Sequence, residues 1–273
     1  MEEEYAEAWE RLGLTAINCS TLSFRTFLIV VEGISNFTYD LDNLRDIIVK
    51  ATCVEDVRRA KREGKHAIMW NFQNTVLFGG GVDVERELDN IDFFYHLGVR
   101  VVQLTYNLRN FVGDGCTERY QSGLSYFGIK VVERLNKLGM LVDVSHCGHQ
   151  TTMDAIEVSK DPVVATHTAC KGVHFHNRNK TDEEMQAIAE KGGYVGILRE
   201  QPFIGGKGTI KEILDHIDYA VDLIGNRPRR HRDRPHLLPL PPTLARDIGA
   251  EDKKGRASKS QVMVRLEARG ASR

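Results

Sequence analysis

Two histidines follow neighbouring buried strands of the expected fold. The apolar runs Met140–Val144 and Val163–Ala165 have the length and β-branching of buried parallel strands, and a hydroxyl residue and a histidine (His146 and His167) follow them. A helix expected over Thr151–Ser159 completes a βαβ unit. Functional residues of parallel α/β folds lie at the carboxyl ends of the strands, so we expect both imidazoles at one edge. Neutral imidazole is a good zinc ligand, and the pair is therefore a candidate metal site.

A single histidine at a strand end is more often a hydrogen-bonded structural residue, but two at matched positions favour a metal or catalytic role. Cys147 and Cys170 lie close to the histidines in the sequence. They could be ligands or nucleophiles, although buried small hydrophobic residues are the commoner interpretation of such cysteines.

The composition is that of a soluble protein with a sizeable core, and it changes near the end of the chain. Of 273 residues, 41% are hydrophobic and 27% charged. The net charge of −1 hides an asymmetry, because residues 226–273 hold 13 Lys and Arg against 5 Asp and Glu, and five of the seven prolines. We expect one domain over residues 1–225 and a basic Arg/Pro-rich tail over 226–273, either disordered or out of frame.

Cysteine usage and the N-terminus indicate a cytoplasmic protein. The five cysteines show no CxxC spacing, so a disulfide framework is not expected. The start of the chain is acidic and carries no signal-peptide pattern. The apolar run Phe27–Val31 is far shorter than the ~20 residues that a membrane span needs. We therefore expect no membrane contact.

Strand and helix patterns alternate along the chain. Helices are expected over 2–12, 40–50, 54–63, 84–97, 126–138, 210–224 and after the capping residue Thr181, and further strands over 14–19, 66–72, 99–104 and 194–198. Such alternation predicts a parallel sheet, either a (β/α)8 barrel or an open doubly wound sheet. Polar residues recur at the strand ends, which favours the barrel: Asn18, Gln73, Tyr106, His146 and His167. Six repeats are too few to close it, so we expect an incomplete TIM-type barrel.

Several motifs in order resemble those of the membrane (renal-type) dipeptidases, which are zinc peptidases with an amidohydrolase-like barrel. The matching segments are Tyr95–Thr105, Gly123–Gly128, Asn136–His146, Pro162–His167, Arg178-Asn179 with Asp182, and Lys191–Gly193. The resemblance implies a metal-dependent hydrolase of dipeptides or similar small amides. It also implies that His146 and His167 bind one zinc of a dinuclear pair, and that Arg178 holds the substrate carboxylate, a role that suits a guanidinium.

The chain departs from the family pattern at four places. No His-x-Asp motif occurs before Leu14, and no late Gly-x-Asp-Phe-Asp type motif is found. Gln73 stands where the family has its metal-bridging glutamate, and Tyr106 stands where it has a substrate-pocket histidine. A neutral amide cannot supply the negative charge that holds two dications together. One or two zinc ions stay open, with a single-metal site favoured over a dinuclear one, and Gln73 and Tyr106 are expected to line the substrate pocket.

The ends of the family pattern suggest a chain truncated at its N-terminus and frameshifted after Gly225. Valid codons for Asn226 to His236, read one nucleotide later, give Thr-Asp-His-Val-Gly-Ile-Gly-Thr-Asp-Leu, which is the kind of motif that the family would place there. A nucleic-acid-binding role for the basic tail is the weaker interpretation, because it has no aromatic interleaving and no recognisable motif. Resequencing of the genomic region tests the frameshift.

Two functions from different classes stay open. One is a metal-dependent dipeptidase acting on a small peptide. The other is a catalytically inactive relative that acts as a binding or oligomerising protein, because missing first and last strands would leave open sheet edges that invite self-association, for example as a homodimer. Bound zinc and hydrolysis of a dipeptide panel distinguish them.

Overall fold

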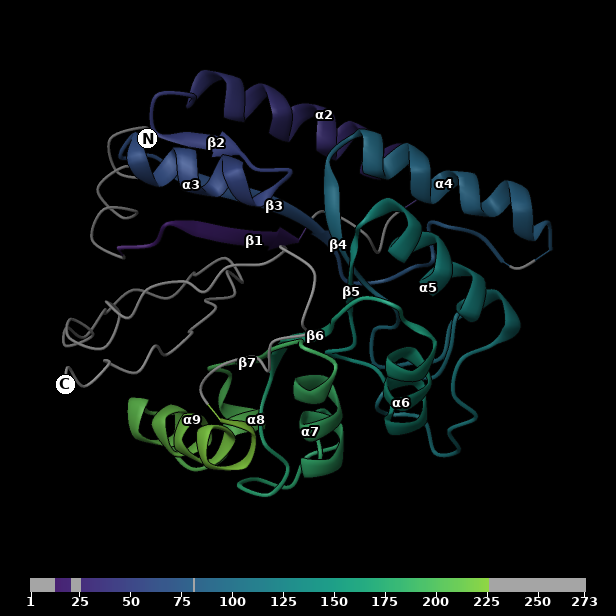
Figure 1. Ribbon diagram of the computed structural model, residues 1–273, viewed down its shortest axis with the longest axis vertical. Coiled ribbons are helices and arrows are strands. Elements are labelled where there is room, and N and C mark those ends of the chain that lie inside the picture. Colours follow the sequence, from purple (N-terminus) through teal and green to yellow (C-terminus); the bar gives the residue numbers. More distant parts are fainter. Residues whose placement is uncertain (1–12, 21–25, 81, 226–273) are drawn as a thin grey trace.

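The described part of the chain forms a parallel sheet with helices on its outer side, as the sequence predicted (Figure 1). The computed structural model describes residues 13–20, 26–80 and 82–225. Its strands are β1 Ala16–Ser20, β2 Ile48–Lys50, β3 His66–Phe72, β4 Val99–Gln103, β5 Leu141–Asp143, β6 Val163–Thr168 and β7 Val195–Ile197. Their order is β1-β3-β4-β5-β6-β7, with β2 paired to β3, and all of these pairs are parallel.

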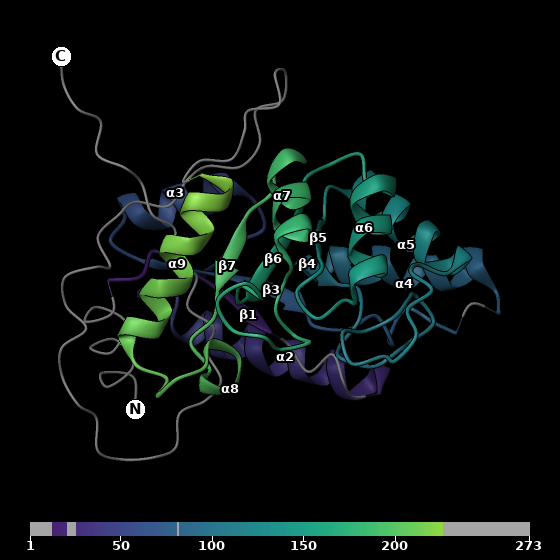
Figure 2. The same ribbon diagram turned by 90° about the horizontal axis from the view of Figure 1, so that it is seen from below.

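Helices connect the strands and cover the outside of the sheet, which curls like part of a barrel (Figures 1 and 2). They are α2 Phe27–Asn43, α3 Val54–Arg62, α4 Val84–His96, α5 Tyr126–Leu138, α6 His149–Val158, α7 Asp182–Glu190, α8 Gln201–Ile204 and α9 Ile210–Ile224. Within the described ranges β1 and β7 are the edges of the sheet. The barrel-type architecture is therefore confirmed, as is its incompleteness over this part of the chain.

The prediction of a helix over 40–50 was wrong. The helix α2 ends at Asn43, and Ile48–Lys50 instead pairs in parallel with the start of β3. Ile47, Ile48 and Val49 are β-branched, and pairing with a buried strand decides the conformation of such a run more than helical spacing does. The predicted helix over 2–12 and the predicted tail over 226–273 lie outside the described residues, so the domain division stays a prediction.

The strand β6 is longer than its apolar run predicts. It continues to Thr168, so His167 lies within the strand rather than after it. Every residue of β6 is buried, including its two threonines and the histidine. A strand that is buried on both faces keeps its ladder hydrogen bonds through polar residues as long as their side chains also find partners.

Aromatic side chains fill the core between α4 and the sheet. The Phe94 ring is fully buried, and its centroid lies 4.7 Å from that of Phe72 in an edge-to-face arrangement. Phe78 and Trp70 are also fully buried in this core. Burial of these rings holds α4 against β3 and β4, the strands that precede the histidine unit.

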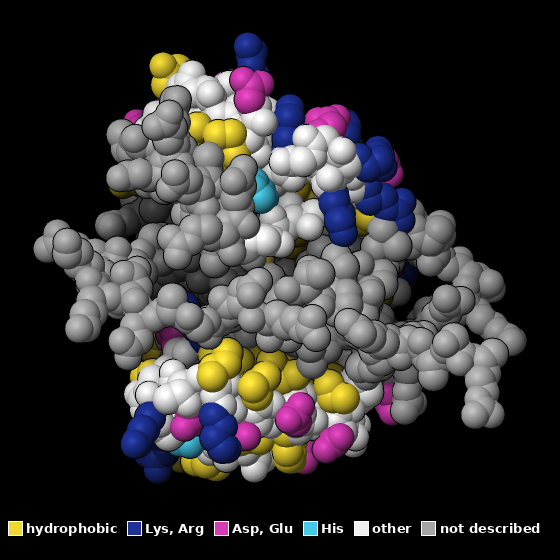
Figure 3. All heavy atoms as spheres, turned by 90° about the vertical axis from the view of Figure 1, so that its left-hand side faces the viewer, with side chains coloured by type: hydrophobic (Ala, Val, Ile, Leu, Met, Phe, Trp, Pro, Cys, Tyr) yellow, Lys and Arg dark blue, Asp and Glu magenta, His cyan; other side chains and the backbone are white. Residues whose placement is uncertain are grey.

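The outer side of α9 leaves hydrophobic side chains exposed. Ile210 and Leu214 are each 47% exposed, and hydrophobic side chains gather over the lower part of the molecule in Figure 3. The opposite side of α9 packs inward through His216, Ile217 and Ala220. Across the described ranges no helix combines the length and apolar character that a membrane crossing requires.

We predict that Phe94→Ala destabilises the fold strongly. Loss of this ring removes buried contacts and leaves a cavity, which costs about 3–5 kcal/mol of unfolding free energy. Phe93→Ala is the matched control, because the neighbouring ring is 40% exposed, and we expect a loss below about 2 kcal/mol. Urea unfolding of the two variants measures the difference, and equal losses would contradict this account of the core.

Candidate metal centre

The two histidines lie side by side at the carboxyl edge of the sheet. His146 follows β5 and His167 lies in the neighbouring strand β6, and their Nε2 atoms are 2.9 Å apart. Each residue is only 7% exposed. The structure thus brings together the pair that the sequence singled out, because parallel pairing of β5 and β6 places both strand ends at the same edge.

The facing nitrogen atoms fit two ligands of one zinc ion. The 2.9 Å contact is a hydrogen bond between the rings if one Nε2 carries a proton; if both Nε2 atoms carry lone pairs, it is a repulsive approach that a cation between them would relieve. Two ligands at a Zn–N distance of ~2.0–2.1 Å with tetrahedral angles lie about 3.3 Å apart, so the observed spacing is close to that of a bound pair. No third His, Cys, Asp or Glu joins them to form a metal-binding group within the described residues. The donor set therefore fits half of a four-coordinate site.

A buried carboxylate ties the two histidine strands together. Asp143, the last residue of β5, accepts hydrogen bonds from the N–H and hydroxyl of Ser145 at 2.9 and 2.5 Å, and from the N–H and hydroxyl of Thr166 at 3.2 and 2.5 Å. The Ser145 hydroxyl in turn accepts from the His167 N–H. These bonds fix the backbone immediately before each histidine.

Each imidazole also contacts a side-chain oxygen through Nδ1. His146 Nδ1 lies 2.7 Å from Asn107 Oδ1, and His167 Nδ1 lies 2.8 Å from the Thr166 hydroxyl. The Tyr106 ring stacks on the His146 ring with a centroid distance of 4.1 Å. Tyr106 and Asn107 both come from the loop after β4. This loop therefore holds the His146 ring from its face and from its edge.

Arg178 is buried against the same strand ends. Its guanidinium donates hydrogen bonds to the carbonyl of Ser145 and, at 2.5 Å, to the carbonyl of His167. Its Nε atom is buried without a hydrogen-bond partner. Burial lowers the pKa of Arg178 to about 10, so it stays charged at neutral pH. In this structure the guanidinium thus clamps the histidine strands, and its role toward a substrate carboxylate stays a prediction.

Gln73, the remaining candidate, lies directly after β3 at the same edge. The strand β4 lies between β3 and the histidine strands in the sheet order. The Gln73 carbonyl accepts a hydrogen bond from Gln103 Nε2 at 2.7 Å. The structure therefore keeps Gln73 on the candidate edge, and its position as a counterpart of a bridging ligand stays a prediction.

Burial sets the protonation of the neighbouring groups. Desolvation, with a smaller contribution from the Arg178 charge, holds the pKa of His167 well below its usual value, so this imidazole is neutral and able to bind metal. Burial raises the pKa of Cys147 to about 11 and that of Cys170 to about 12. These thiols are protonated at neutral pH, which favours the interpretation of both as buried small residues over nucleophiles.

Sequence reasoning missed Asn107, Asp143 and Lys180. Asp143 could have been found from its spacing, because a carboxylate stands three residues before His146 at a buried strand end. Asn107 gave no local signal, since its contact with His146 crosses 39 residues of chain. Lys180 was not singled out from the sequence, and the structure buries it to 2% exposure.

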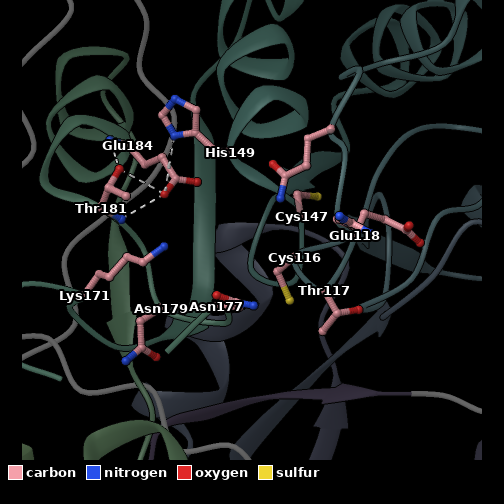
Figure 4. Close-up of a pocket in the computed structure, with 12 residues that line it drawn as sticks. Cys116, Thr117, Glu118, Cys147, His149, Lys171, Asn177, Asn179, Thr181 and Glu184 are labelled. Atoms are coloured by element: carbon pink, nitrogen blue, oxygen red, sulfur yellow. Dashed lines mark hydrogen bonds and ion pairs between the residues drawn. The ribbon is translucent and has the colours of Figure 1, made fainter. Parts of the chain in front are cut away.

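A polar cavity of about 460 Å³ has Cys147, the residue after His146, in its lining (Figure 4). Glu184 of α7 lines it as well, and the buried Lys180 ammonium binds Glu184 at 2.9 Å, Thr152 at 2.7 Å and the Cys147 carbonyl at 3.0 Å. This ion pair therefore fastens the loop after His146 to the start of α7.

A comparison with known families matches residues 16–228 to the membrane dipeptidases, described as Peptidase family M19. The chain belongs to this family. Its motifs and its barrel-type sheet thus have a common origin with those of the dipeptidases, as the sequence resemblance predicted.

Individual relatives agree with this membership. An uncharacterized dipeptidase of Schizosaccharomyces pombe is 33% identical over 185 residues, which is 63% of this chain and 42% of the relative. The dipeptidase verJ of Clonostachys rogersoniana is 33% identical over 134 residues, 48% of this chain and 34% of that protein. The chain thus spans well under half the length of these family members.

Solved structures show the same fold. An amidohydrolase of Pseudomonas aeruginosa is 35% identical with a TM-score of 0.74, covering 82% of this chain and 67% of that one. A metallopeptidase of Rhodobacter sphaeroides, liganded with a phosphinate mimic of the dipeptide L-Ala-D-Ala, is 21% identical with a TM-score of 0.66, covering 72% and 58%. The second likeness shows the fold of the family only.

We predict that Glu184→Gln destabilises this family member and changes its acid sensitivity. Burial of the Glu184 carboxyl opposes ionisation, but the Lys180 charge and the Thr181 N–H outweigh it and hold the pKa below its ordinary 4.5. Breaking the pair leaves a buried ammonium and costs about 3–5 kcal/mol at neutral pH. Since the carboxyl pKa is lowered in the fold, this difference from the parent chain is complete above pH ~4.5 and shrinks as the pH falls further.

Unfolding by urea from neutral pH down to acid measures this difference. Glu183→Gln is the matched control, because the adjacent side chain is 69% exposed, and its effect stays below about 1 kcal/mol. A loss for Glu184→Gln that does not depend on pH would contradict the ion-pair account.

Proposed function

We propose that the chain is a metal-dependent hydrolase of the dipeptidase type that cleaves dipeptides or similar small amides. The observation that carries the proposal is the 2.9 Å approach of His146 Nε2 and His167 Nε2 at the carboxyl edge of a barrel-type sheet. Membership in the membrane dipeptidase family supports the reaction class, as do the dipeptidases among its relatives.

The two imidazoles and the groups around them have different proposed roles in metal binding and hydrolysis. His146 and His167 hold the metal ion, with zinc as the proposed species. The ion, when bound, supplies an activated water and polarises the scissile carbonyl. The Asp143 carboxylate and the Arg178 guanidinium keep the two strand ends fixed, so the imidazoles need not rearrange. The Tyr106 ring covers one face of His146 and limits the space beside it.

The proposal specifies one metal ion and not two. Gln73 occupies the position of the family's bridging glutamate, and a neutral amide adds no charge to offset a second dication. We propose that Arg178 holds the substrate carboxylate, as the family resemblance implies, while its guanidinium also binds the backbone of both strand ends. Gln73 and Tyr106 then line the substrate pocket.

Zinc content and peptide hydrolysis test this function directly. We expect about one zinc per purified chain and turnover of a dipeptide panel, with loss of both in His146→Ala and His167→Ala. Hydrolysis should fall by about two orders of magnitude or more, since the activated water is lost with the ion. His96→Ala is the matched control, because this exposed histidine of α4 lies away from the site and should leave both measurements unchanged.

The second candidate is a binding relative without catalysis. It is favoured by the observation that no third ligand joins the two histidines within the described residues. Absence of stoichiometric zinc together with absence of turnover in the parent chain would support it and overturn the hydrolase. We further propose a cytoplasmic location, supported by five free cysteines, and a homodimer through the sheet edges at β1 and β7, which analytical ultracentrifugation tests.

A further inference from the structure

The Nδ1 atom of each candidate ligand faces an oxygen that selects its tautomer. Asn107 Oδ1 lies 2.7 Å from His146 Nδ1, and the Cys116 thiol donates to the same oxygen at 3.6 Å. An amide oxygen only accepts hydrogen bonds. His146 must therefore carry its proton on Nδ1, which leaves the lone pair on Nε2.

The Thr166 hydroxyl selects the Nδ1–H tautomer of His167, because Asp143 fixes the direction of the hydroxyl proton. An ionised carboxylate only accepts, so the hydroxyl proton of Thr166 goes to Asp143 Oδ2 at 2.5 Å. The hydroxyl oxygen is then free to accept the Nδ1–H of His167 at 2.8 Å. The Ser145 hydroxyl cannot replace this arrangement, because its own proton is directed to Asp143 Oδ1 at 2.5 Å.

The competing tautomer would block the metal position. If His167 carried its proton on Nε2, it would donate to His146 Nε2 across the 2.9 Å gap, and the lone pairs of both rings would be lost to a metal ion. Nothing in the pair itself prevents this hydrogen bond. The oxygen acceptors at Nδ1 of the two rings therefore decide whether the imidazoles can bind a metal ion or form a hydrogen bond with each other.

The backbone of Asn107 is held in a conformation that fits this role. Its φ of 60° lies in the left-handed region, the one such value among non-glycine residues of the described ranges. The Asn107 carbonyl accepts hydrogen bonds from the N–H and hydroxyl of Thr117, at 3.0 and 2.7 Å. A non-glycine residue keeps such a backbone conformation only where neighbouring contacts hold it, and such residues are common at functional sites.

We propose that Asn107 and the Asp143–Thr166 pair are positioning residues that hold both histidines in the Nδ1–H tautomer, so that their Nε2 lone pairs converge on one cation. The inference rests on the proposed function, since it assigns how this chain prepares the two ligands of that site. It makes the loop after β4 and the end of β5 part of the metal-binding apparatus.

Nitrogen-15 NMR of the histidine rings in the metal-free full chain tests the tautomers. At a pH about two units above the ordinary imidazole value of ~6.5, we expect protonated Nδ1 in both His146 and His167. Thr166→Val should move the His167 proton to Nε2, whereas Thr166→Ser should keep the parent spectrum. A parent chain with the His167 proton on Nε2 would overturn the proposal.

Zinc affinity, measured by calorimetry, provides the second readout. We expect Thr166→Val and Asn107→Ala to weaken binding by about 10–100-fold, and Thr166→Ser and Asn107→Asp to restore it to within about threefold. Thr151→Val is the matched control, because this buried hydroxyl contacts the Asp114 N–H and no imidazole, and it should change neither affinity nor spectrum.

The two failures are distinguishable. If His146→Ala and His167→Ala bind zinc as the parent does, the proposed function is wrong. If zinc binding needs both histidines but Thr166→Val and Asn107→Ala bind with parent affinity, or lose affinity that serine and aspartate do not restore, only the positioning role is wrong.

Discussion

The buried carboxylate of Asp143 is the point on which the candidate site depends. It is 2% exposed and accepts four hydrogen bonds, from the backbone and hydroxyl of Ser145 and from those of Thr166. A charge in this position would be very costly without such donors, and with them it becomes a rigid junction between β5 and β6. Because His146 and His167 are adjacent to these donors, the junction sets the spacing of the imidazoles.

Two buried cations complete this frame. Arg178 binds the carbonyls of Ser145 and His167, and its charge interacts favourably with that of Asp143. Lys180 binds the Cys147 carbonyl and Glu184, which joins the loop after His146 to α7. Arginine and lysine are almost never buried unless they are paired. Their burial here is therefore compensated by the hydrogen bonds and charge interactions just described. The frame thus holds both strand ends and the loop after His146 in place.

This frame holds some of the candidate site residues and not others. His146, His167 and Arg178 lie together at one edge of the sheet, whereas the correspondence of Gln73 and Tyr106 with a glutamate and a histidine of the family motif stays a prediction from the sequence. The first group is held by the Asp143 junction, whereas Gln73 follows β3 and Tyr106 lies in the loop after β4. This division is the reason that we propose a single metal ion for this family member.

The sequence by itself determined the parallel α/β architecture, most helices and the two histidines, because hydrophobic periodicity and strand-end polarity are local properties that the chain carries at each position. It could not determine that Ile48–Lys50 is a strand, since the pairing partner lies in β3. Nor could it show that Asn107 meets His146, that Thr166 connects Asp143 to His167, or that Arg178 binds the backbone. These contacts join residues far apart in the chain or depend on which way a buried side chain points, and only the packed tertiary structure decides that.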